Sequence, residues 1–223
     1  MKISLILPAA GSGKRMGSAV EKQFLKIGKK TILEWTLTVF NNNPLISEIV
    51  LILPPEKVKL LARKLCLKFE KISAVIAGGK DRVDSVRNGF NMLTGNPDIV
   101  LIHDAVRPMV TQQNIKDVIN SCRKYPAVTL AVPVKDTIKR VKGTEILETP
   151  DRSFLWHTQT PQGFKTAVLE KCLNQVKKLK GKPTDECQIA ERLGFDTHVV
   201  AGNYFNIKIT TPEDLIFAKS VLK

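Results

Sequence analysis

The sequence predicts an α/β sandwich built on a mostly parallel β-sheet. Short apolar runs rich in β-branched residues alternate with stretches of helical periodicity. These runs are apolar at nearly every position, which is typical of strands buried on both faces of a parallel sheet. The repeated order strand, helix, strand gives right-handed crossovers that place helices on both faces. Ligands bind such sheets where the carboxyl ends of the strands open, so the loops after the strands are the candidate site.

The individual elements follow from the same patterns. We expect strands, in chain order, at Ile3–Leu7, Ile49–Leu53, Ala74–Ala77, Ile99–Ile102, Val128–Pro133 and Thr197–Ala201. We expect helices between the earlier strands at about Thr31–Asn41, Glu56–Phe69, Asp81–Leu93 and Gln112–Lys124. Nearer the C-terminus we expect a helix over Phe164–Leu179, a helix capped by Thr184 or Asp185, a strand that carries Lys208, and a last helix beginning near Pro212.

The alternation stops between Asp136 and Phe164. This stretch reads as short strands with a turn at Lys142-Gly143. We therefore expect one domain over residues 1–223 with a β-arm inserted at about 136–160. The edges of a projecting hairpin need covering, and a second copy of the same arm would cover them.

Composition limits the possible classes of protein. The 223 residues suit one large domain, and 35 lysines and arginines against 21 acidic residues give a net charge of +14. That excess indicates anionic partners or simple solubility. No apolar run is long enough to span a membrane, and the apolar N-terminus leads into a glycine loop, as a first strand would, with no transit peptide. The four cysteines are widely spaced, which argues against zinc and disulfides and favours a cytoplasmic protein, or one in a plastid-like compartment.

A glycine loop follows the first strand. Gly11 and Gly13 let backbone amides converge on an anion, and Lys14, Arg15 and Lys22 add positive charge. The loop is not a Walker A motif, because that motif needs a glycine and a Ser or Thr at positions held by Pro8 and Arg15. The pattern favours a nucleoside triphosphate site, and a tight turn with solvent-facing cations is the alternative.

Two further strand ends carry polar residues. Gly78-Gly79 precedes Asp81, Arg82 and Ser85, which favours a base, ribose or phosphate there, with a turn capped by Asp81 as the alternative.

The second of these strand ends is His103 to Pro108. Asp104 is placed for a metal–phosphate complex and Arg107 for a substrate phosphate, unless the two form a structural ion pair. For His103 we favour a packed strand residue. Tyr204 and Lys208 match the spacing of a dehydrogenase pair, but that pair needs a helix and this segment reads as a strand.

Taken together, the motifs resemble one enzyme family. PAAGSGKRMG, EKQFL, GGKDRVDSVRNG, IHDAVRP, PVKDTIKRV, DRSFLWHTQTPQGF, TDE and NIKITTPEDL occur in the order and spacing of the 2-C-methyl-D-erythritol 4-phosphate cytidylyltransferases, called IspD in bacteria. The sister family, ribitol-5-phosphate cytidylyltransferases, is similar in the glycine loop, HDAVRP and QTPQ. PAAGSG, LWHTQTPQ and NIKITTPEDL favour the erythritol enzyme.

The resemblance implies a Rossmann-like three-layer fold, a homodimer built through the β-arm, and a role for each matching residue. Arg15 and Lys22 would stabilise the transition state, whereas Arg152 and Lys208 would position the methylerythritol phosphate. Thr137 would join Arg152 in the partner's site, and Asp104 and Arg107 would line the same pocket. The nucleotide would lie near Ala9, Ala10, Gly11, Gly13, Lys14, Gly79, Asp81, Arg82 and Ser85. In one departure from the family pattern, Glu21 stands where proline usually precedes the lysine.

The implied reaction transfers CMP from CTP to the acceptor phosphate. A phosphate monoester is already largely dianionic at pH 7, so the nucleophile needs no general base. Mg²⁺ would be bound mainly by the CTP phosphates. Asp104 is one candidate protein ligand, and the sequence assigns no other. The second class of function is nucleic-acid binding, suggested by the +14 charge alone. The chain shows no such module and has only 2 Trp and 2 Tyr. We therefore expect neither a nucleic-acid nor a membrane partner.

Overall fold

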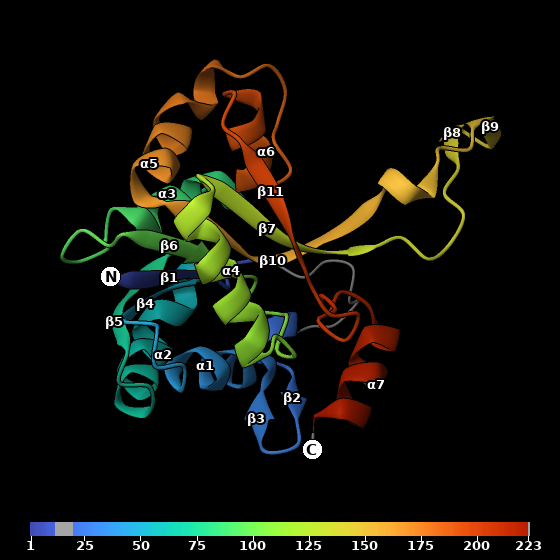
Figure 1. Ribbon diagram of the computed structural model, residues 1–223. Helices are drawn as coiled ribbons and strands as arrows, with labels where there is room; N and C mark the ends of the chain where they lie inside the picture. Colours follow the sequence, from blue (N-terminus) through green and yellow to red (C-terminus); the bar gives the residue numbers. More distant parts are fainter. Residues whose placement is uncertain (12–19, 223) are drawn as a thin grey trace.

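Figure 1 shows the computed structural model, which describes residues 1–11 and 20–222. Its centre is a seven-stranded sheet in the order β11-β7-β10-β6-β1-β4-β5. The strands are β1 (Ile3–Pro8), β4 (Glu48–Leu53), β5 (Ile72–Ala77), β6 (Ile99–Ile102), β7 (Ala127–Pro133), β10 (Trp156–Lys165) and β11 (Thr197–Ala201). β10 runs antiparallel to both β6 and β7, whereas the other neighbouring strands pair in parallel. The predicted mostly parallel sheet is confirmed.

Helices cover both faces of this sheet and make three layers (Figure 1). Residues of α1 (Ile32–Asn41), α2 (Pro55–Lys68) and α4 (Gln112–Lys124) share a core with one face. Residues of α3 (Arg82–Phe90), α5 (Thr166–Gln175) and α6 (Glu186–Arg192) share a second core with the other face. The side chains of β1 divide accordingly, because Leu5 and Leu7 lie in the first core and Ile6 in the second.

A third, smaller core attaches the C-terminal helix. α7 (Pro212–Val221) packs near α1 and the hairpin of β2 (Lys26–Ile27) and β3 (Lys30–Thr31), through buried residues that include Ile27, Ile209 and Ala218. Single turns of 3-10 helix lie at η2 (Lys22–Phe24), η3 (Arg152–Phe154) and η4 (Val176–Lys178). No helix in the described ranges is long and apolar enough to cross a bilayer.

Two parts of the predicted secondary structure are wrong. The helix expected from Phe164 begins at Thr166, because Phe164 and Lys165 still pair with Val100 and Ile99 of β6 as the end of β10. The strand expected around Lys208 is absent, because residues 206–210 pair with no strand of the described sheets. Their backbone is held instead by α7, where the Asp214 carboxylate accepts hydrogen bonds from the backbone N–H groups of Thr210 and Thr211.

The β-arm forms between β7 and β10. β8 (Arg140–Lys142) and β9 (Glu145–Glu148) pair antiparallel, and Gly143 adopts φ +62° in the predicted turn, a conformation that favours glycine. All seven residues of the two strands are exposed. The hairpin projects well away from the sheet (Figure 1), so the sheet does not contribute to its stability.

Candidate active site

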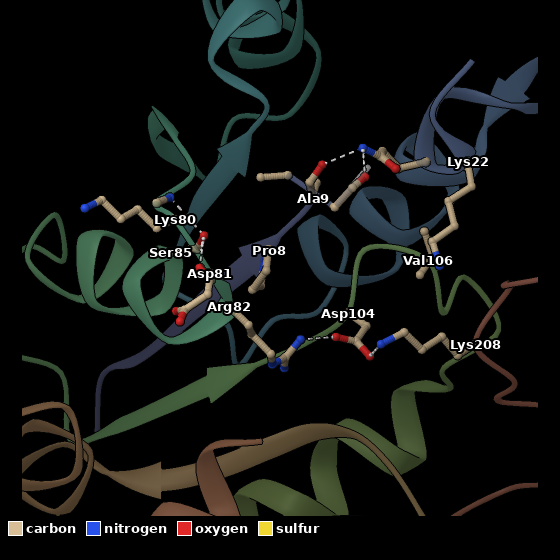
Figure 2. A pocket seen from close by; sticks show the side chains of 14 residues that line it. Pro8, Ala9, Lys22, Lys80, Asp81, Arg82, Ser85, Asp104, Val106 and Lys208 are labelled. Atoms are coloured by element: carbon tan, nitrogen blue, oxygen red, sulfur yellow. Dashed lines mark hydrogen bonds and ion pairs between the residues drawn. The ribbon is translucent and has the colours of Figure 1, made fainter. Parts of the chain in front are cut away.

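A pocket of about 560 Å³ opens where β1, β5 and β6 end (Figure 2). This volume lies in the range of small-molecule sites. Its walls come from the loop after β1, the start of α3, the residues after β6, the η2 turn and the segment before α7. The described lining carries four cations and two carboxylates, namely Lys22, Lys80, Arg82, Lys208, Asp81 and Asp104. An anionic ligand therefore suits it.

The loop after β1 is held in place from both sides. Ala9 donates its backbone N–H to the Ile52 carbonyl at 2.7 Å. The buried Gln23 amide donates to the carbonyls of Ala9 at 2.7 Å and Gly11 at 3.1 Å. Gln23 is in the same turn as Lys22, which lines the pocket. The loop and Lys22 are thus positioned together. The residues predicted further along the loop, Gly13, Lys14 and Arg15, lie outside the described residues.

The two glycines after β5 are required by the packing of the protein itself. A Cβ atom on Gly78 would lie 2.5 Å from the Cβ of Ala10, and one on Gly79 would lie 2.6 Å from the Cβ of Asp84. Glycine therefore lets the first loop and α3 approach each other closely. This packing explains the glycine pair by itself, so the pair is not evidence that a base binds here.

The start of α3 is the capped turn that the sequence left as an alternative. The Asp81 carboxylate accepts the backbone N–H of Asp84 at 3.0 Å, so it occupies one of the amides that a phosphate would need. The Ser85 hydroxyl accepts the Gly79 N–H at 3.0 Å and donates to the Asp81 carbonyl at 2.8 Å. Gly79, Asp81, Arg82 and Ser85 all line the pocket nevertheless.

Asp104, directly after β6, is the hub of the pocket floor. Its carboxylate lies 2.5 Å from Nη1 of Arg82, 2.9 Å from Nζ of Lys208 and 3.6 Å from Nε of Arg107. The first two of these ion pairs are drawn in Figure 2. Burial alone would raise the pKa of Asp104, but the charges of Arg82, Lys208 and Arg107 outweigh it and hold that pKa well below its ordinary value. Asp104 is therefore ionised at neutral pH.

Arg107 does not line the pocket, although the sequence placed it near a substrate phosphate. Its guanidinium donates to the backbone carbonyls of Asn206 at 2.8 Å and Thr158 at 3.3 Å. Asn206 is fully buried, and its amide donates to the Thr160 carbonyl at 2.9 Å. Arg107 thus fixes the segment that carries Lys208 two residues later, and its ion pair with Asp104 is structural.

His103 is a packed strand-end residue, as the sequence favoured. Its Nε2 faces the Arg107 carbonyl at 3.1 Å, and a carbonyl can only accept, so Nε2 carries the proton. Its Nδ1 then accepts from the Thr160 hydroxyl at 3.0 Å, while that hydroxyl accepts the Asp104 N–H. Burial lowers the pKa of His103 to about 3. The neutral ring is fully used in holding Asp104.

The arm residues lie apart from this pocket. Neither Arg152 nor Thr137 lines it, and both are exposed. The Arg152 guanidinium donates to the Lys135 carbonyl at 2.8 Å, at the root of the arm. A single chain therefore does not bring these two residues to the cations around Asp104.

Three residues of the site are not predicted by local sequence patterns. Gln23 ties down the first loop, Lys80 lines the pocket beside Gly79, and the buried Glu186 accepts from Arg82. Periodicity could not find them, because glutamine, lysine and glutamate are common on surfaces. The only signal was that each lies inside a motif of the family resemblance.

The fold and pocket define the class: an α/β protein with a cation-rich pocket, suited to an anionic small molecule, at the carboxyl ends of a mostly parallel sheet. The model of the 2-C-methyl-D-erythritol 4-phosphate cytidylyltransferase family, IspD, matches residues 3–223. The chain belongs to this family and is a cytidylyltransferase, hence a nucleotidyltransferase enzyme. The resemblance noted from the motifs is confirmed.

Individual relatives agree along the whole chain. The cytidylyltransferase of this name from Clostridium perfringens is 44% identical over 225 residues, covering 100% of this chain and 99% of the relative. That from Halalkalibacterium halodurans is 40% identical over 224 residues, covering 100% and 97%.

Solved structures show the same likeness. The 4-diphosphocytidyl-2C-methyl-D-erythritol synthase of Anaerococcus prevotii has a TM-score of 0.87 at 32% identity, covering 99% of this chain and 98% of that one. The Francisella tularensis IspD has a TM-score of 0.82 at 33% identity, covering 100% of both chains.

Proposed function

We propose that this protein transfers CMP from CTP to 2-C-methyl-D-erythritol 4-phosphate, giving 4-diphosphocytidyl-2-C-methyl-D-erythritol and pyrophosphate. The observation that carries the proposal is the group of cations around Asp104, at the strand ends of a chain that matches the IspD family over residues 3–223. A phosphate oxygen of the acceptor bonds to the α-phosphorus of CTP. The bond from that phosphorus to the oxygen bridging to the β-phosphate breaks, and pyrophosphate leaves with the electron pair.

The chemistry requires positioning and charge neutralisation rather than a base. The acceptor phosphate is largely dianionic at pH 7 and attacks without losing a proton. His103, the histidine nearest the pocket floor, is neutral and has both ring nitrogens engaged. The barrier lies in bringing anions together in line, so cations and fixed geometry lower it.

Each cation takes a role by its place. Lys22, together with Arg15, neutralises the triphosphate and the leaving pyrophosphate. Lys208 holds the acceptor phosphate, and Asp104 keeps its amine in position until substrate arrives. The wall proposed for the nucleotide is lined by Ala9, Ala10, Gly11, Gly79, Lys80, Asp81, Arg82 and Ser85. Gly13 and Lys14 follow further along the same loop.

A divalent cation would enter with CTP rather than reside in the protein. Both Asp104 oxygens already face cations, and within the described ranges no group of three His, Cys, Asp or Glu could hold a metal. These donors do not fit a resident Mg²⁺ site. Mg²⁺ on the CTP phosphates is then part of the substrate.

We propose further that the enzyme is a homodimer that acts in the cytoplasm. Arg152 and Thr137 lie on an exposed arm away from their own pocket, as residues that complete a partner's site would. Free cysteines at 66, 122, 172 and 187 suit a reducing compartment.

The experiment that tests the function is pyrophosphate release. CTP, UTP and ATP are each supplied with Mg²⁺ and with either 2-C-methyl-D-erythritol 4-phosphate or D-ribitol 5-phosphate. We expect release only with CTP and the erythritol phosphate. Release with ribitol phosphate alone would instead place the activity with the sister enzymes, and no release with either acceptor would contradict the proposal.

A further inference from the structure

Glu186 is a buried carboxylate that the reaction described above does not use. It is the first residue of α6, and its side chain is fully buried. Burial raises the pKa of Glu186, and the ion pair with Arg82 opposes that effect. A carboxylate in such a place is costly unless it is paired, so its partner defines its role.

That partner is Arg82, which stands 104 residues earlier in the chain. Oε2 of Glu186 accepts from both Nε and Nη2 of Arg82 at 3.2 Å, so the two N–H groups on one edge of the guanidinium converge on a single oxygen. On its other side, Nη1 of Arg82 donates to Asp104 at 2.5 Å. The guanidinium is thereby held between two carboxylates, which fix its plane as well as its position.

This clamp leaves part of Arg82 available to a ligand. A guanidinium has five N–H groups, of which three are engaged by Glu186 and Asp104. The other two have no partner among the residues that the structure describes, and Arg82 lines the pocket.

Glu186 also balances the charge of the pocket floor. Arg82, Lys208 and Arg107 surround Asp104, and Glu186 is the second carboxylate in contact with this group. Without it, Asp104 alone would face three cations. The Arg82 guanidinium would then be free to rotate away from Asp104. Asp104 would lose the contact that fixes its carboxylate while it holds Lys208.

We infer that Glu186 is a positioning residue for CMP transfer, acting through Arg82. It fixes the guanidinium against Asp104, leaves two N–H groups of this pocket-lining residue unengaged, and so maintains the arrangement in which Asp104 presents Lys208. The inference rests on the proposed function, since it assigns a residue of that same site.

A double-mutant cycle tests it. Glu186→Gln keeps the shape of the side chain and removes its charge, and we expect kcat/KM for the acceptor at saturating CTP to fall about tenfold. Arg82→Met should lose at least as much. The double variant should then equal Arg82→Met within about twofold, because Glu186 has nothing left to position. Glu191→Gln, an exposed residue of the same helix with the same charge change, should match wild type.

Each outcome decides something. Glu186→Gln with wild-type activity, or losses that multiply in the double variant, would overturn the inference, because a merely structural role acts independently of Arg82. Thermal unfolding of each variant shows whether it folds, and if Arg82→Met does not, Arg82→Lys replaces it in the cycle, since lysine lacks the forked edge. A wild-type protein without pyrophosphate release would overturn the proposed function and this inference together, whereas an active wild type separates the two.

Discussion

The three cations on Asp104 lie in different settings, and their surroundings separate their roles. The Arg107 guanidinium donates to backbone carbonyls, and Arg82 is paired with a second carboxylate, that of Glu186. Lys208 is the most exposed of the three, with 38% of its side chain accessible. A phosphate that enters the pocket can therefore bind the Lys208 amine with less disruption of other contacts than if it bound Arg82 or Arg107.

Lys208→Met tests this at the level of one side chain. We expect turnover to fall about 10²–10³-fold, the range seen when a group that stabilises transition-state charge is lost. Folding should hardly change, because Asp104 keeps Arg82 and Arg107 as partners. Pyrophosphate release and thermal unfolding measure the two effects, with Lys219→Met in the exposed part of α7 as the matched control. A Lys208→Met enzyme with normal turnover would remove the assignment.

His103 makes a separate prediction about pH and stability. The pKa of His103 is about 3 in the folded protein, against about 6.5 for a histidine in an unfolded chain. Below about pH 6.5 this histidine is protonated in the unfolded state but stays neutral in the folded state. The free energy of unfolding therefore falls as the pH falls toward 3. One such group contributes about 1.4 kcal/mol per pH unit within that window.

The measurement is the free energy of unfolding from pH 7 to pH 4.5. His103→Gln can keep both hydrogen bonds and cannot be protonated, so its curve should be flatter than wild type by about one proton. It should also be less stable at pH 7, because it loses the tilted contact of the imidazole ring with Phe40, whose centroids lie 4.7 Å apart. His157→Gln, on an exposed residue, should retain the wild-type slope. Identical slopes for all three proteins would show that His103 titrates normally.

At the level of secondary structure, the sequence predicts the elements that have a clear apolar pattern or a recognisable cap. β1, β4 and β6 are clear because they are buried on both faces, and Asp81 marks the start of α3. The sequence leaves the cap of α6 open between Thr184 and Asp185, and the structure shows that it is Asp185. The sequence predicts short strands in the stretch up to Phe164, but not that β10 joins the central sheet, because its buried centre, Gln159, Thr160, Pro161 and Gln162, carries no apolar signal. The polar groups of Gln159 are bonded to distant partners, Thr129 and Asn206, that local sequence does not reveal.

The site residues also divide into those that local sequence predicts and those whose role depends on distant partners. Asp104 and Lys208 were found because they follow apolar runs or precede a recognisable helix start. The roles of Glu186 and Arg107 depend on partners about 100 residues away, at Arg82 and Asn206, so no spacing within one motif could predict them.

The arm supports a prediction about a whole element. It exposes Val141, Ile146, Leu147, Phe154 and Trp156, so it offers an apolar surface that its own domain does not cover. Replacing residues 141–147 by Asn-Gly would close the hairpin where Arg140 and Glu148 already pair. We expect the unfolding temperature to stay within a few degrees of wild type, because the hairpin does not contact the sheet, and self-association to be lost.

Sedimentation velocity over a range of concentrations measures that association. Val141→Lys with Ile146→Lys, which keeps the hairpin but charges it, is the matched variant and should weaken the proposed dimer. A shortened arm that still gives the wild-type sedimentation coefficient of a dimer would move the interface elsewhere.

For the whole molecule, the net charge of +14 is consistent with an enzyme whose substrates are all anionic. Positive charge spread over the surface attracts such substrates from a distance and raises their rate of encounter. This reading accounts for the basic composition without a nucleic-acid partner.

Whether the molecule works as a single chain or as a pair is decided by where Arg152 acts. If the arm of one subunit completes the pocket of the other, Lys208→Met and Arg152→Ala damage opposite halves of each shared site. A mixed dimer of the two variants then contains one site with both defects and one site with neither. Random pairing makes about half of the dimers mixed, so subunit exchange should restore about a quarter of wild-type activity. Each variant exchanged with itself should stay at its own low level, and a mixture that never rises above them would mean that Arg152 acts within its own chain or not at all.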